Sequence, residues 1–532
     1  MAIAIDFGTS NTVVARWNPI TGQPETLKLP GLSVQQGQNP PLIPSLVYVE
    51  DAAKEQILAG KTVLDRGLDL SKDPRFFRNF KRGIGSEIQG FLPELDGKTV
   101  TFEQAGQWFL TEIARSIRDV PLSLDSLILT VPVDSFEIYR HWLGKVCQDL
   151  EIDRVRMVDE PTAAALGYGL ADREIVLVVD FGGGTLDLSV VRLEAGGKTP
   201  TQPLGFILKW GEKSFAESSG QKVQTARVLA KAGQNLGGSD IDNWLVDYFV
   251  QTQGLAKSPI ATRLAERLKI QLSLQTQASE VYFNDETFES YELELDRDRF
   301  ETILTDRLFF KQLDESMTQV LQQARRQGIE IGDIDAVLLV GGTSQIPAVQ
   351  TWVQQYFAAE KIRAGRPLDA IATGALQLTQ GIEVKDFLYH SYGIRYWDRR
   401  QNAHNWHPII KAGQPYPMTE PVELLLGASM ANQPKIELVL GELGNDSAAT
   451  EVYFDGDRLV TRPVAGTQAT VKPLNDTEGG RSIAQLNPLG NPGTDRIKVR
   501  FRIDDRRFLR ISVEDLLTME TLLDDRAVIQ LS

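Results

Sequence analysis

The sequence predicts an α/β protein that ends in a region built of strands, and three observations lead to this prediction. From Met1 to about residue 380, apolar runs typical of buried strands alternate with stretches of helical periodicity. Beyond Gly381, short alternating runs separated by turn residues predominate. Within the first region, AIAIDFGTSNTVVA at the start is repeated in similar form as VLVVDFGGGTLDLSVV from Val176, so one strand-turn-strand unit occurs twice.

The composition is that of a globular protein. With 532 residues, 42% of them apolar and 24% charged, the chain can form roughly three or four folding units with cores of their own. The net charge of −15 argues against a general binder of nucleic acids or anionic membranes, because either needs a basic surface.

Cysteine usage and the amino-terminal sequence predict a compartment. Cys147 is the single cysteine and only four histidines are present, which excludes an intrachain disulfide and argues against a zinc site. No run of about 18 apolar residues occurs, and Asp6 lies where a secretory signal would need its apolar region. We therefore expect a soluble, cytoplasmic protein.

Elements of the α/β region can be assigned in order. Strands are expected at residues 126–131, 176–180 and 336–340, each β-branched or leucine-rich and each ending at Pro, Asp or Gly. DEPTAAALGYGL from Asp159 predicts a helix with Pro161 in its first turn. ATRLAERLKIQLSLQ from Ala261 has the apolar spacing of another helix.

The region beyond Gly381 predicts an all-β domain. IKVRFRI from Ile497 alternates without a break, and FLRISVE from Phe508 repeats the alternation after a turn, which predicts a hairpin with one solvated face. PVELLLGAS, KIELVLGE and EVYFDGD add short strands, and the sequence stops on the strand-like AVIQLS. Residues 444–493 are rich in Gly, Asn, Pro and Thr and are predicted to form a long loop.

The repeated unit suggests a chemistry. A strand that ends in Asp and turns through Gly brings a carboxylate next to backbone N–H groups that can face an anion. Two such hairpins would clamp a polyphosphate and its Mg²⁺, with Asp6 and Asp180 near the hydrated metal. Asp-Gly pairs also make turns without function. Recurrence within matching strands, and a third glycine turn in AVLLVGGTSQIP from Ala336, favour a duplicated phosphate-binding unit.

The motifs resemble those of a known family. IDFGTSNTVVA, VDEPTAAALGYGL, VVDFGGGTLDLSVV, NLGGSDIDNWL and VLLVGGTSQIP occur in the order and spacing of the seventy-kilodalton heat-shock protein chaperones, the DnaK-like family. The resemblance covers about the first 380 residues strongly and the β region more weakly. It implies an actin-like, two-lobed ATPase domain at 1–380, a linker at 381–391, and an all-β, sandwich-like domain at 392–532 that binds a substrate or partner. In a departure from the family, we expect this domain to have no helical lid.

The resemblance also implies roles for individual residues. Lys81, in FFRNFKRGIG, matches the catalytic lysine, whose charge would stabilise the transferred γ-phosphoryl group. Without the other motifs, a solvated basic cluster with Arg78 and Arg82 would be the simpler interpretation. Glu160 and Asp180 match positions that orient the attacking water. The remaining catalytic and phosphate-loop matches are Asp6, Gly8, Thr9, Ser10, Gly182, Gly183, Gly184 and Thr185, with Asp6, Glu160 and Asp180 near Mg²⁺ mainly through water. Asn11 is also placed beside the phosphates, where the family commonly has an aromatic residue.

A second set of residues matches the adenosine site of the family. Glu266, Lys269 and Ser273 lie at i, i+3 and i+7, so one helix face presents all three. An exposed Glu and Lys pair is the alternative. The glycine-rich segments of the same cleft contribute Gly237, Gly238, Gly341, Gly342, Thr343 and Gln345. Gln345 stands where the family usually has Arg, and an amide stacks less well on adenine, so weaker nucleotide affinity is expected.

Other departures concern segments. Residues 194–225 interrupt the family pattern and are predicted to form a surface loop. The linker VKDFLYHSYG keeps only part of the family's leucine-rich run, which puts interdomain coupling in doubt. The β domain is either a peptide-binding sandwich or a docking module without a groove. His390, His404 and His407 are interpreted as loop or strand-edge residues, because no acidic or Cys partner has metal-ligand spacing.

Three functions are compatible with these features. The first is an ATP-hydrolysing, lidless, chaperone-like protein that binds ATP and Mg²⁺ and so controls the binding of unfolded polypeptide or a dedicated client. J-domain proteins and nucleotide-exchange factors are then possible partners. The second is a nucleotide-dependent scaffold with negligible turnover. The third is a small-molecule kinase of the actin-like fold, which leaves the β domain without a purpose.

Overall fold

The computed structural model describes most of the chain. It covers residues 2–18, 20–70, 72–86, 88–90, 92–119, 126–132, 136–149, 155–169, 174–195, 207–210, 224–284, 288–377, 391–398, 403–411, 414, 416–418, 420–443, 450–455, 458–463, 471–475, 482–504 and 507–531. The predicted linker at 381–391 lies outside these residues except for Ser391, and so does His390.

The chain divides into two units. The first comprises Met1–Gly197, Ile207–Val384 and Thr450–Arg462, and the second comprises Lys198–Phe206, Lys385–Ala449 and Pro463–Ser532. The first unit changes to the second at Val384–Lys385, within the predicted linker at 381–391. Thr450–Arg462 belongs to the first unit, although the sequence places it in the β domain.

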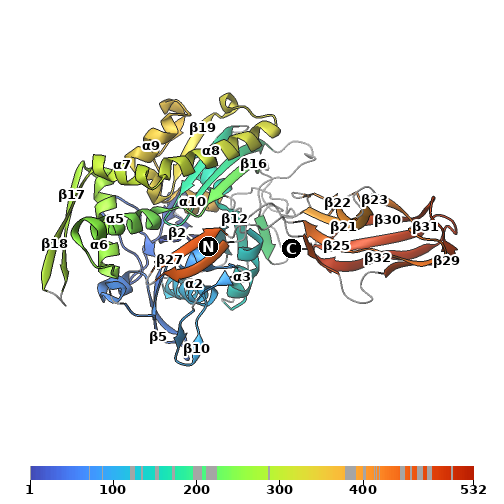
Figure 1. Ribbon diagram of the computed structural model, residues 1–532, viewed down its shortest axis with the longest axis horizontal. Coiled ribbons are helices and arrows are strands. Elements are labelled where there is room, and N and C mark those ends of the chain that lie inside the picture. Colours follow the sequence, from blue (N-terminus) through green and yellow to red (C-terminus); the bar gives the residue numbers. More distant parts are fainter. Residues whose placement is uncertain are drawn as a thin grey trace. The chain divides into compact units, whose positions relative to one another are not determined.

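Two sheets with matching strand order form the centre of the first unit (Figure 1). In one sheet, β1 pairs antiparallel with β2 and parallel with β11. In the other, β13 pairs antiparallel with β14 and parallel with β19. The first set is flanked by β3 and β12, and the second by β16 and β20. The predicted duplication therefore extends from the hairpins to five strands of each sheet.

The strand bounds follow the apolar runs of the sequence. The first sheet contains β1 (Ala2–Asp6), β2 (Asn11–Trp17), β3 (Pro24–Thr26), β4 (Ile43–Pro44), β11 (Ser126–Val131), β12 (Val155–Asp159) and β15 (Ile207–Trp210). The second contains β13 (Ile175–Phe181), β14 (Leu186–Ala195), β16 (Gln224–Gln234), β19 (Ala336–Val340) and β20 (Ile362–Arg363). The three strands predicted in this region are thus confirmed as β11, β13 and β19. β11 and β19 are buried at every position, which explains why their sequences are largely apolar and do not alternate.

Two short helices pack between the sheets. The residues of α4 (Glu160–Gly167) and α10 (Ala370–Gln377) share one apolar cluster with strands of both sheets. The helices cross closely, because a Cβ added at Gly374 would lie 1.9 Å from the carbonyl oxygen of Ala163. The predicted helix in DEPTAAALGYGL is confirmed as α4, and the amide of Thr162 donates to the Asp159 carboxylate at its start, at 2.8 Å. Its Ala and Gly residues permit the crossing.

The longer helices lie outside the sheets. α3 (Phe136–Asp149) contacts β11 and β12 of the first sheet, and α2 (Phe102–Asp119) packs against α3. α1 (Lys61–Asp65) precedes both in the sequence. The second sheet shares an apolar core with α5 (Gly238–Gln253), α6 (Pro259–Leu274), α7 (Arg297–Asp306), α8 (Phe309–Arg326) and α9 (Pro347–Gln354). α6 is the helix predicted from Ala261. A hairpin of β17 (Gln277–Asn284) and β18 (Glu289–Asp296) extends beyond α5 and α6 (Figure 1).

Short elements complete the first unit. β5 (Leu46–Asp51) pairs with β6 (Gln56–Ala59) and β7 (Phe76–Arg78), and β9 (Glu94–Leu95) pairs with β10 (Lys98–Thr99). The 3₁₀ segments are η1 (Leu68–Leu70), η2 (Phe80–Gly83), η4 (Ile331–Asp333), η5 (Gly342–Gln345) and η6 (Ala359–Lys361). β8 (Ile88–Gln89) pairs in parallel with β26 (Thr450–Asp455), whose other neighbour is β27 (Arg458–Pro463).

The loop predicted at 194–225 is wrong for its described residues. β14 continues to Ala195 and pairs with β16 from Gln224, and β15 pairs antiparallel with β12. The strands extend because each gains backbone hydrogen bonds from a neighbour far away in sequence, which the Gly- and Ser-rich composition does not reveal.

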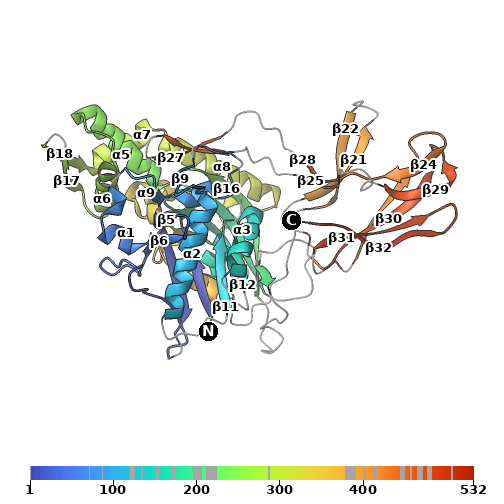
Figure 2. The ribbon, with the colours of Figure 1, turned by 90° about the horizontal axis from the view of Figure 1, so that it is seen from below.

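The second unit is an all-β sandwich in its described residues. One sheet contains β21 (Ser391–Asp398), β22 (Ala403–Ile410), β25 (Leu440–Leu443) and β28 (Val471–Pro473). The other contains β23 (Val422–Gly427), β30 (Asp495–Ile503), β31 (Phe508–Asp515) and β32 (Thr521–Gln530), of which the last three run side by side (Figure 2). β24 (Gln433–Glu437) pairs with β29 (Ser482–Gly490). Side chains from these strands share one core.

The predicted hairpin with one wet face is confirmed in this unit. Ile497, Val499, Phe501 and Ile503 of β30 are fully buried, and β31 pairs with β30 through seven residue pairs. The long loop predicted at 444–493 is wrong for its described residues, since β26, β27, β28 and β29 fall inside it. In the part of the chain that the structure describes, no helix is long and apolar enough to cross a membrane.

Candidate functional site

The glycine turns of the two repeated hairpins touch each other. A Cβ added at Gly183 would lie 1.9 Å from the Ser10 hydroxyl oxygen, and one added at Gly184 would lie 2.6 Å from the Thr9 hydroxyl oxygen. Thr9 is buried. The turn after β1 and the turn after β13 therefore meet with no room for a further side chain at Gly183 or Gly184.

Two more glycine segments close on the second turn. A Cβ at Gly237 would lie 2.5 Å from the backbone of Gly183, and one at Gly341 would lie 2.3 Å from the carbonyl oxygen of Phe181. The Thr343 hydroxyl donates to the carbonyl of Gly182 at 2.8 Å. Four segments that are far apart in sequence therefore bring backbone groups together, an arrangement suited to a ligand rich in anionic oxygens.

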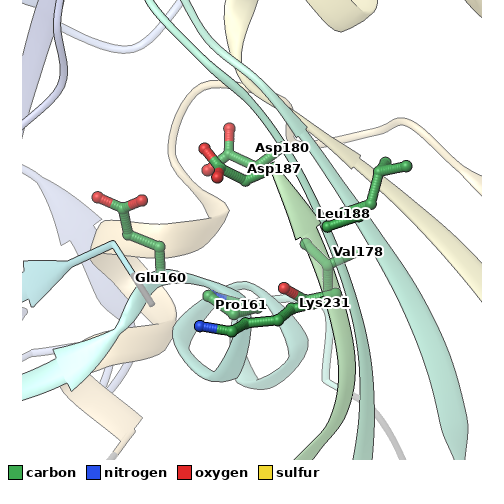
Figure 3. Close-up of a pocket in the computed structure, with 9 residues that line it drawn as sticks. Glu160, Pro161, Val178, Asp180, Asp187, Leu188 and Lys231 are labelled. Carbon is green, nitrogen blue, oxygen red and sulfur yellow. The ribbon is translucent and has the colours of Figure 1, made fainter. Parts of the chain in front are cut away.

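Carboxylates gather next to these turns. Asp180 of β13 lies directly opposite Asp187 of β14 in the hairpin register. Their carboxylates lie close together and share one pocket with Glu160, Pro161 and Lys231 (Figure 3). Asp187 was missed in the sequence, although a signal was present. It lies between Leu186 and Leu188 on β14, so strand alternation places its side chain on the face opposite to these two apolar residues.

Burial and mutual repulsion perturb two of these acids. Burial first, and then the charge of Glu160, raise the pKa of Asp6 to about 6, with Lys81 and a hydrogen bond from the Thr130 hydroxyl opposing the shift. Burial also raises the pKa of Asp180 well above its ordinary value, and the charges of Glu160, Asp187 and Asp6 add to this. A bound cation would relieve the same repulsion.

Lys81 is buried in the site and not part of a solvated basic cluster. Its side chain is 11% exposed, and its ammonium donates to Glu160 Oε1 at 3.0 Å. Burial by itself would lower the pKa of Lys81, but Glu160, Tyr139 and Asp6 raise it above its ordinary value, so the lysine stays charged. The neighbouring Arg82 is also buried and pairs with Asp240 at 3.3 Å.

The three α6 residues predicted to hold the adenosine, Glu266, Lys269 and Ser273, differ from one another in burial and in hydrogen-bond partners. Lys269 is buried, pairs with Asp242 at 2.7 Å and donates to the carbonyl of Gly238 at 2.9 Å. Burial, partly offset by Lys269, raises the pKa of Asp242 to about 7. Glu266 is half-buried on α6, the helix that also carries Lys269. The Ser273 hydroxyl donates to the carbonyl of Lys269 within α6, at 3.0 Å.

Not every predicted residue lies in the enclosed part of the site. Asn11 is exposed at the start of β2, and Gln345 closes η5 after Gly342 and Thr343. Among the described residues, no group of three His, Cys, Asp or Glu side chains is arranged to ligate a metal directly. The carboxylates Asp6, Glu160 and Asp180 are hard oxygen donors that fit a hydrated Mg²⁺ held through water.

Comparisons with known proteins agree with these features. A family model described as Hsp70 protein matches residues 95–199 and 224–394, just over half of the chain. The chaperone protein DnaK of Thermosipho melanesiensis is 25% identical over 540 residues, which cover 97% of this chain and 78% of the relative. DnaK of Thermosipho africanus gives the same figures. The chaperone protein HscA homolog of Photobacterium profundum is 26% identical over 402 residues, covering 70% of this chain and 57% of the relative.

Proposed function

The chain belongs to the Hsp70 family, and on this premise we propose that it is an ATP-dependent, chaperone-like protein that hydrolyses ATP in its first unit. In this proposal, nucleotide state controls how the β unit binds unfolded polypeptide or a dedicated client. J-domain proteins and nucleotide-exchange factors are proposed as partners, and the cytoplasm as the compartment. The observation that carries the proposal is the contact between the two glycine turns beside a buried Lys81–Glu160 pair.

The glycine turns supply the binding energy for the phosphates. Residues 8–10 and 182–185 would line the phosphates from opposite sides with backbone N–H groups and hydroxyls, except for the Gly182 amide, which donates to the carbonyl of Thr185. The α6 face with Glu266, Lys269 and Ser273 would hold the adenosine, together with the segments at 237–238 and 341–345. Lys269 is supported in this role by its pairing with Asp242, which fixes the ammonium at the start of α5.

Lys81 and Glu160 would act in the hydrolysis step. In the structure the Lys81 ammonium uses one of its three donors on Glu160 Oε1. Binding of a triphosphate would draw the Lys81 ammonium towards the γ-phosphoryl and leave the Glu160 carboxylate to orient the attacking water. The raised pKa of Lys81 supports this role, because an ammonium that stays charged can stabilise developing negative charge on oxygen.

Acids of the site would hold the metal that accompanies the nucleotide. Asp6, Glu160 and Asp180 would contact hydrated Mg²⁺, and we add Asp187 because it lies opposite Asp180. When bound, Mg²⁺ supplies charge neutralisation to the phosphate oxygens. The raised pKa values of Asp6 and Asp180 support a cation site, since a metal would compete with protons for the same carboxylates.

The proposal is tested by single-turnover hydrolysis with Lys81 variants. Lys81→Ala should lower the rate by about a hundredfold or more and leave ATP binding within a few-fold. Because this change leaves Glu160 buried without its partner, Lys81→Gln, which can still donate to the carboxylate, serves as a second variant. Lys361→Ala is the matched control, since Lys361 donates to the carbonyl of Ile334 at 2.6 Å outside the site.

Two results would contradict the proposal. Unchanged hydrolysis in both Lys81 variants would remove the assigned catalytic role. ATP binding without measurable phosphate release in the unaltered protein, combined with an ATP-induced change in the protease sensitivity of the β unit, would favour the nucleotide-dependent scaffold. A fluorescent, permanently unfolded polypeptide tests the chaperone part, because its dissociation from the protein should become faster when ATP is added.

A further inference from the structure

Lys81 lies on a short backbone segment that receives support from a distant helix. η2 has four residues and follows Asn79, whose φ of 55° is left-handed. The carbonyl of Lys81 accepts a long hydrogen bond from the amide of Ile84 at 3.3 Å. It accepts a much shorter one from the hydroxyl of Tyr139, at 2.7 Å. The shorter bond therefore comes from a residue of α3 and not from η2 itself.

Tyr139 also contacts the other end of the same lysine. The Lys81 ammonium nitrogen lies 5.8 Å from the ring centroid of Tyr139 and 5.6 Å from that of Phe7. Both distances fall within the range of cation–π attraction, which is strongest where water is excluded. With Glu160 as the hydrogen-bond acceptor, the ammonium faces two aromatic rings and one carboxylate.

The tyrosine is itself held in place. Tyr139 is 4% exposed, and its ring meets that of Trp142 edge to face, with centroids 5.7 Å apart. The Trp142 indole in turn donates to the carbonyl of Glu103 on α2, at 3.1 Å. Burial raises the pKa of the Tyr139 phenol, so the hydroxyl remains protonated and able to donate.

We propose that Tyr139 is a positioning residue for Lys81, which fixes the lysine carbonyl through its hydroxyl and guides the ammonium with its ring. This inference rests on the proposed role of Lys81 in hydrolysis. A lysine side chain has many rotamers, and a ring on one side removes those that point away from the site. Loss of this support should slow hydrolysis with little change in ATP affinity, because the glycine turns bind the phosphates independently of Lys81.

The experiment separates the hydroxyl from the ring. Tyr139→Phe removes the hydrogen bond to Lys81 and keeps the ring, whereas Tyr139→Leu removes both. Tyr168→Phe is the control, because the Tyr168 hydroxyl also donates to a backbone carbonyl, that of Leu339, at 3.0 Å, and in addition accepts from the amide of Arg366 at 3.1 Å. The readouts are the single-turnover rate, the ATP dissociation constant, the melting temperature and the rate at which acetic anhydride acylates Lys81 in nucleotide-free protein, measured by mass spectrometry relative to the exposed Lys98.

Tyr139→Phe should lower the hydrolysis rate about fivefold and leave the ATP dissociation constant within twofold, which corresponds to the loss of about one hydrogen bond. Tyr168→Phe should lower the melting temperature at least as much as Tyr139→Phe does, because it removes two hydrogen bonds, and should leave hydrolysis unchanged. Tyr139→Leu should slow hydrolysis further and speed acylation of Lys81 at least about threefold. If Tyr139→Phe changes only the melting temperature, as the control does, the positioning role is wrong.

The acylation measurement keeps the two proposals distinguishable. If the unaltered protein hydrolyses no ATP, the proposed function fails, while faster acylation of Lys81 in Tyr139→Leu still supports the contact between tyrosine and lysine. If the unaltered protein hydrolyses ATP and neither Tyr139 variant alters the rate or the acylation, the positioning role fails alone.

Discussion

The two repeated hairpins have the same Asp-Phe-Gly sequence and different neighbours. In the first, a Cβ at Gly8 would lie 2.1 Å from the carbonyl oxygen of Asn11, so this glycine serves the turn of its own hairpin. In the second, the equivalent Gly182 has no neighbour closer than 4.0 Å, and it is the next glycine, Gly183, that has its closest neighbour in the first hairpin, at Ser10. One glycine is required for a turn, and the other for the contact between two turns.

The aspartates of the two hairpins differ in the same way. Asp6 accepts a hydrogen bond from the Thr130 hydroxyl at 2.7 Å, whereas Asp180 lies opposite a second carboxylate, Asp187. A hydroxyl stabilises the ionised acid and a carboxylate opposes it. The two hairpins thus share the turn but differ in the groups next to their aspartates. Burial raises the pKa of both acids, but the Thr130 hydroxyl lowers that of Asp6 and the Asp187 charge raises that of Asp180 further.

The largest effect is expected where a glycine is fixed by its own turn. Gly8→Ala should lower the free energy of unfolding by about 3 kcal/mol, because the methyl group meets backbone and no side chain can move aside. Urea unfolding of the full chain measures this. Gly332→Ala is the control, since a Cβ there has no neighbour within 4 Å. Equal midpoints for the two variants would show that the turn does not require glycine.

The second hairpin should behave differently under the same substitution. Gly183→Ala should cost about 2 kcal/mol, because its nearest neighbours are atoms of the Ser10 side chain. The companion change Ser10→Gly should recover a large part of this loss, whereas the same change combined with Gly8→Ala should recover nothing. A double-mutant cycle with urea unfolding checks both statements. Lack of recovery in the first pair would contradict the contact between the turns.

The aspartates should respond with opposite signs to removal of their partners. Thr130→Val removes the hydrogen bond that lowers the pKa of Asp6, so that pKa should rise further above about 6. Asp187→Asn removes a charge that raises the pKa of Asp180, so that pKa should fall. Carbon-13 NMR titration of labelled aspartate carboxyl groups measures the two shifts. Shifts of the same sign would be incompatible with the geometry.

The same pKa values set a pH dependence of stability. A folded-state pKa raised from 3.8 to about 6 means that the folded protein holds the proton more tightly than the unfolded chain. The contribution of Asp6 to stability is therefore greatest below about pH 4 and falls as the pH rises through about 6. Thr130→Val should extend this fall to higher pH, and Asp187→Asn should reduce the corresponding fall from Asp180. Thermal unfolding between pH 5 and 8 tests both.

The smallest effect is expected for the phenylalanines of the two Asp-Phe-Gly sequences, Phe7 and Phe181. Phe7 lies 5.6 Å from the Lys81 ammonium, whereas Phe181 stacks on Phe309 with centroids 5.8 Å apart. Phe7→Leu and Phe181→Leu should each cost about 1 kcal/mol of stability, because both rings are buried. Only Phe7→Leu should also slow hydrolysis, by about threefold. Equal hydrolysis rates in the two variants would argue that the ring next to Lys81 has no catalytic consequence.

Much of the first unit could be predicted from local pattern. The hairpin strands were evident because they are buried on both faces, and α4 was evident because Asp159 and Pro161 mark its start. The convergence of the two turns could be inferred from their repetition. Asp187 belongs to the same motif and could also have been predicted, because the strand after the glycine turn places it opposite Asp180.

Features that depend on distant partners could not be predicted. β15 and β28 are short and gain their hydrogen bonds from strands far away in sequence, so composition alone favoured loops. Tyr139 reaches Lys81 from a helix, and nothing in the spacing of the two residues indicates the contact. Lys269 was expected to face a ligand, and its buried partner Asp242 carries no signal that separates it from other acids at a helix start.

The pairing of β8 with β26 has a practical consequence for anyone who divides the gene. A fragment that stops at Val384 discards residues 450–462, which complete a three-stranded sheet of the first unit. Such a fragment would expose an unpaired strand edge, a common cause of aggregation during expression. Grafting residues 450–463 back through a short flexible tether would restore the two strands that pair next to β8.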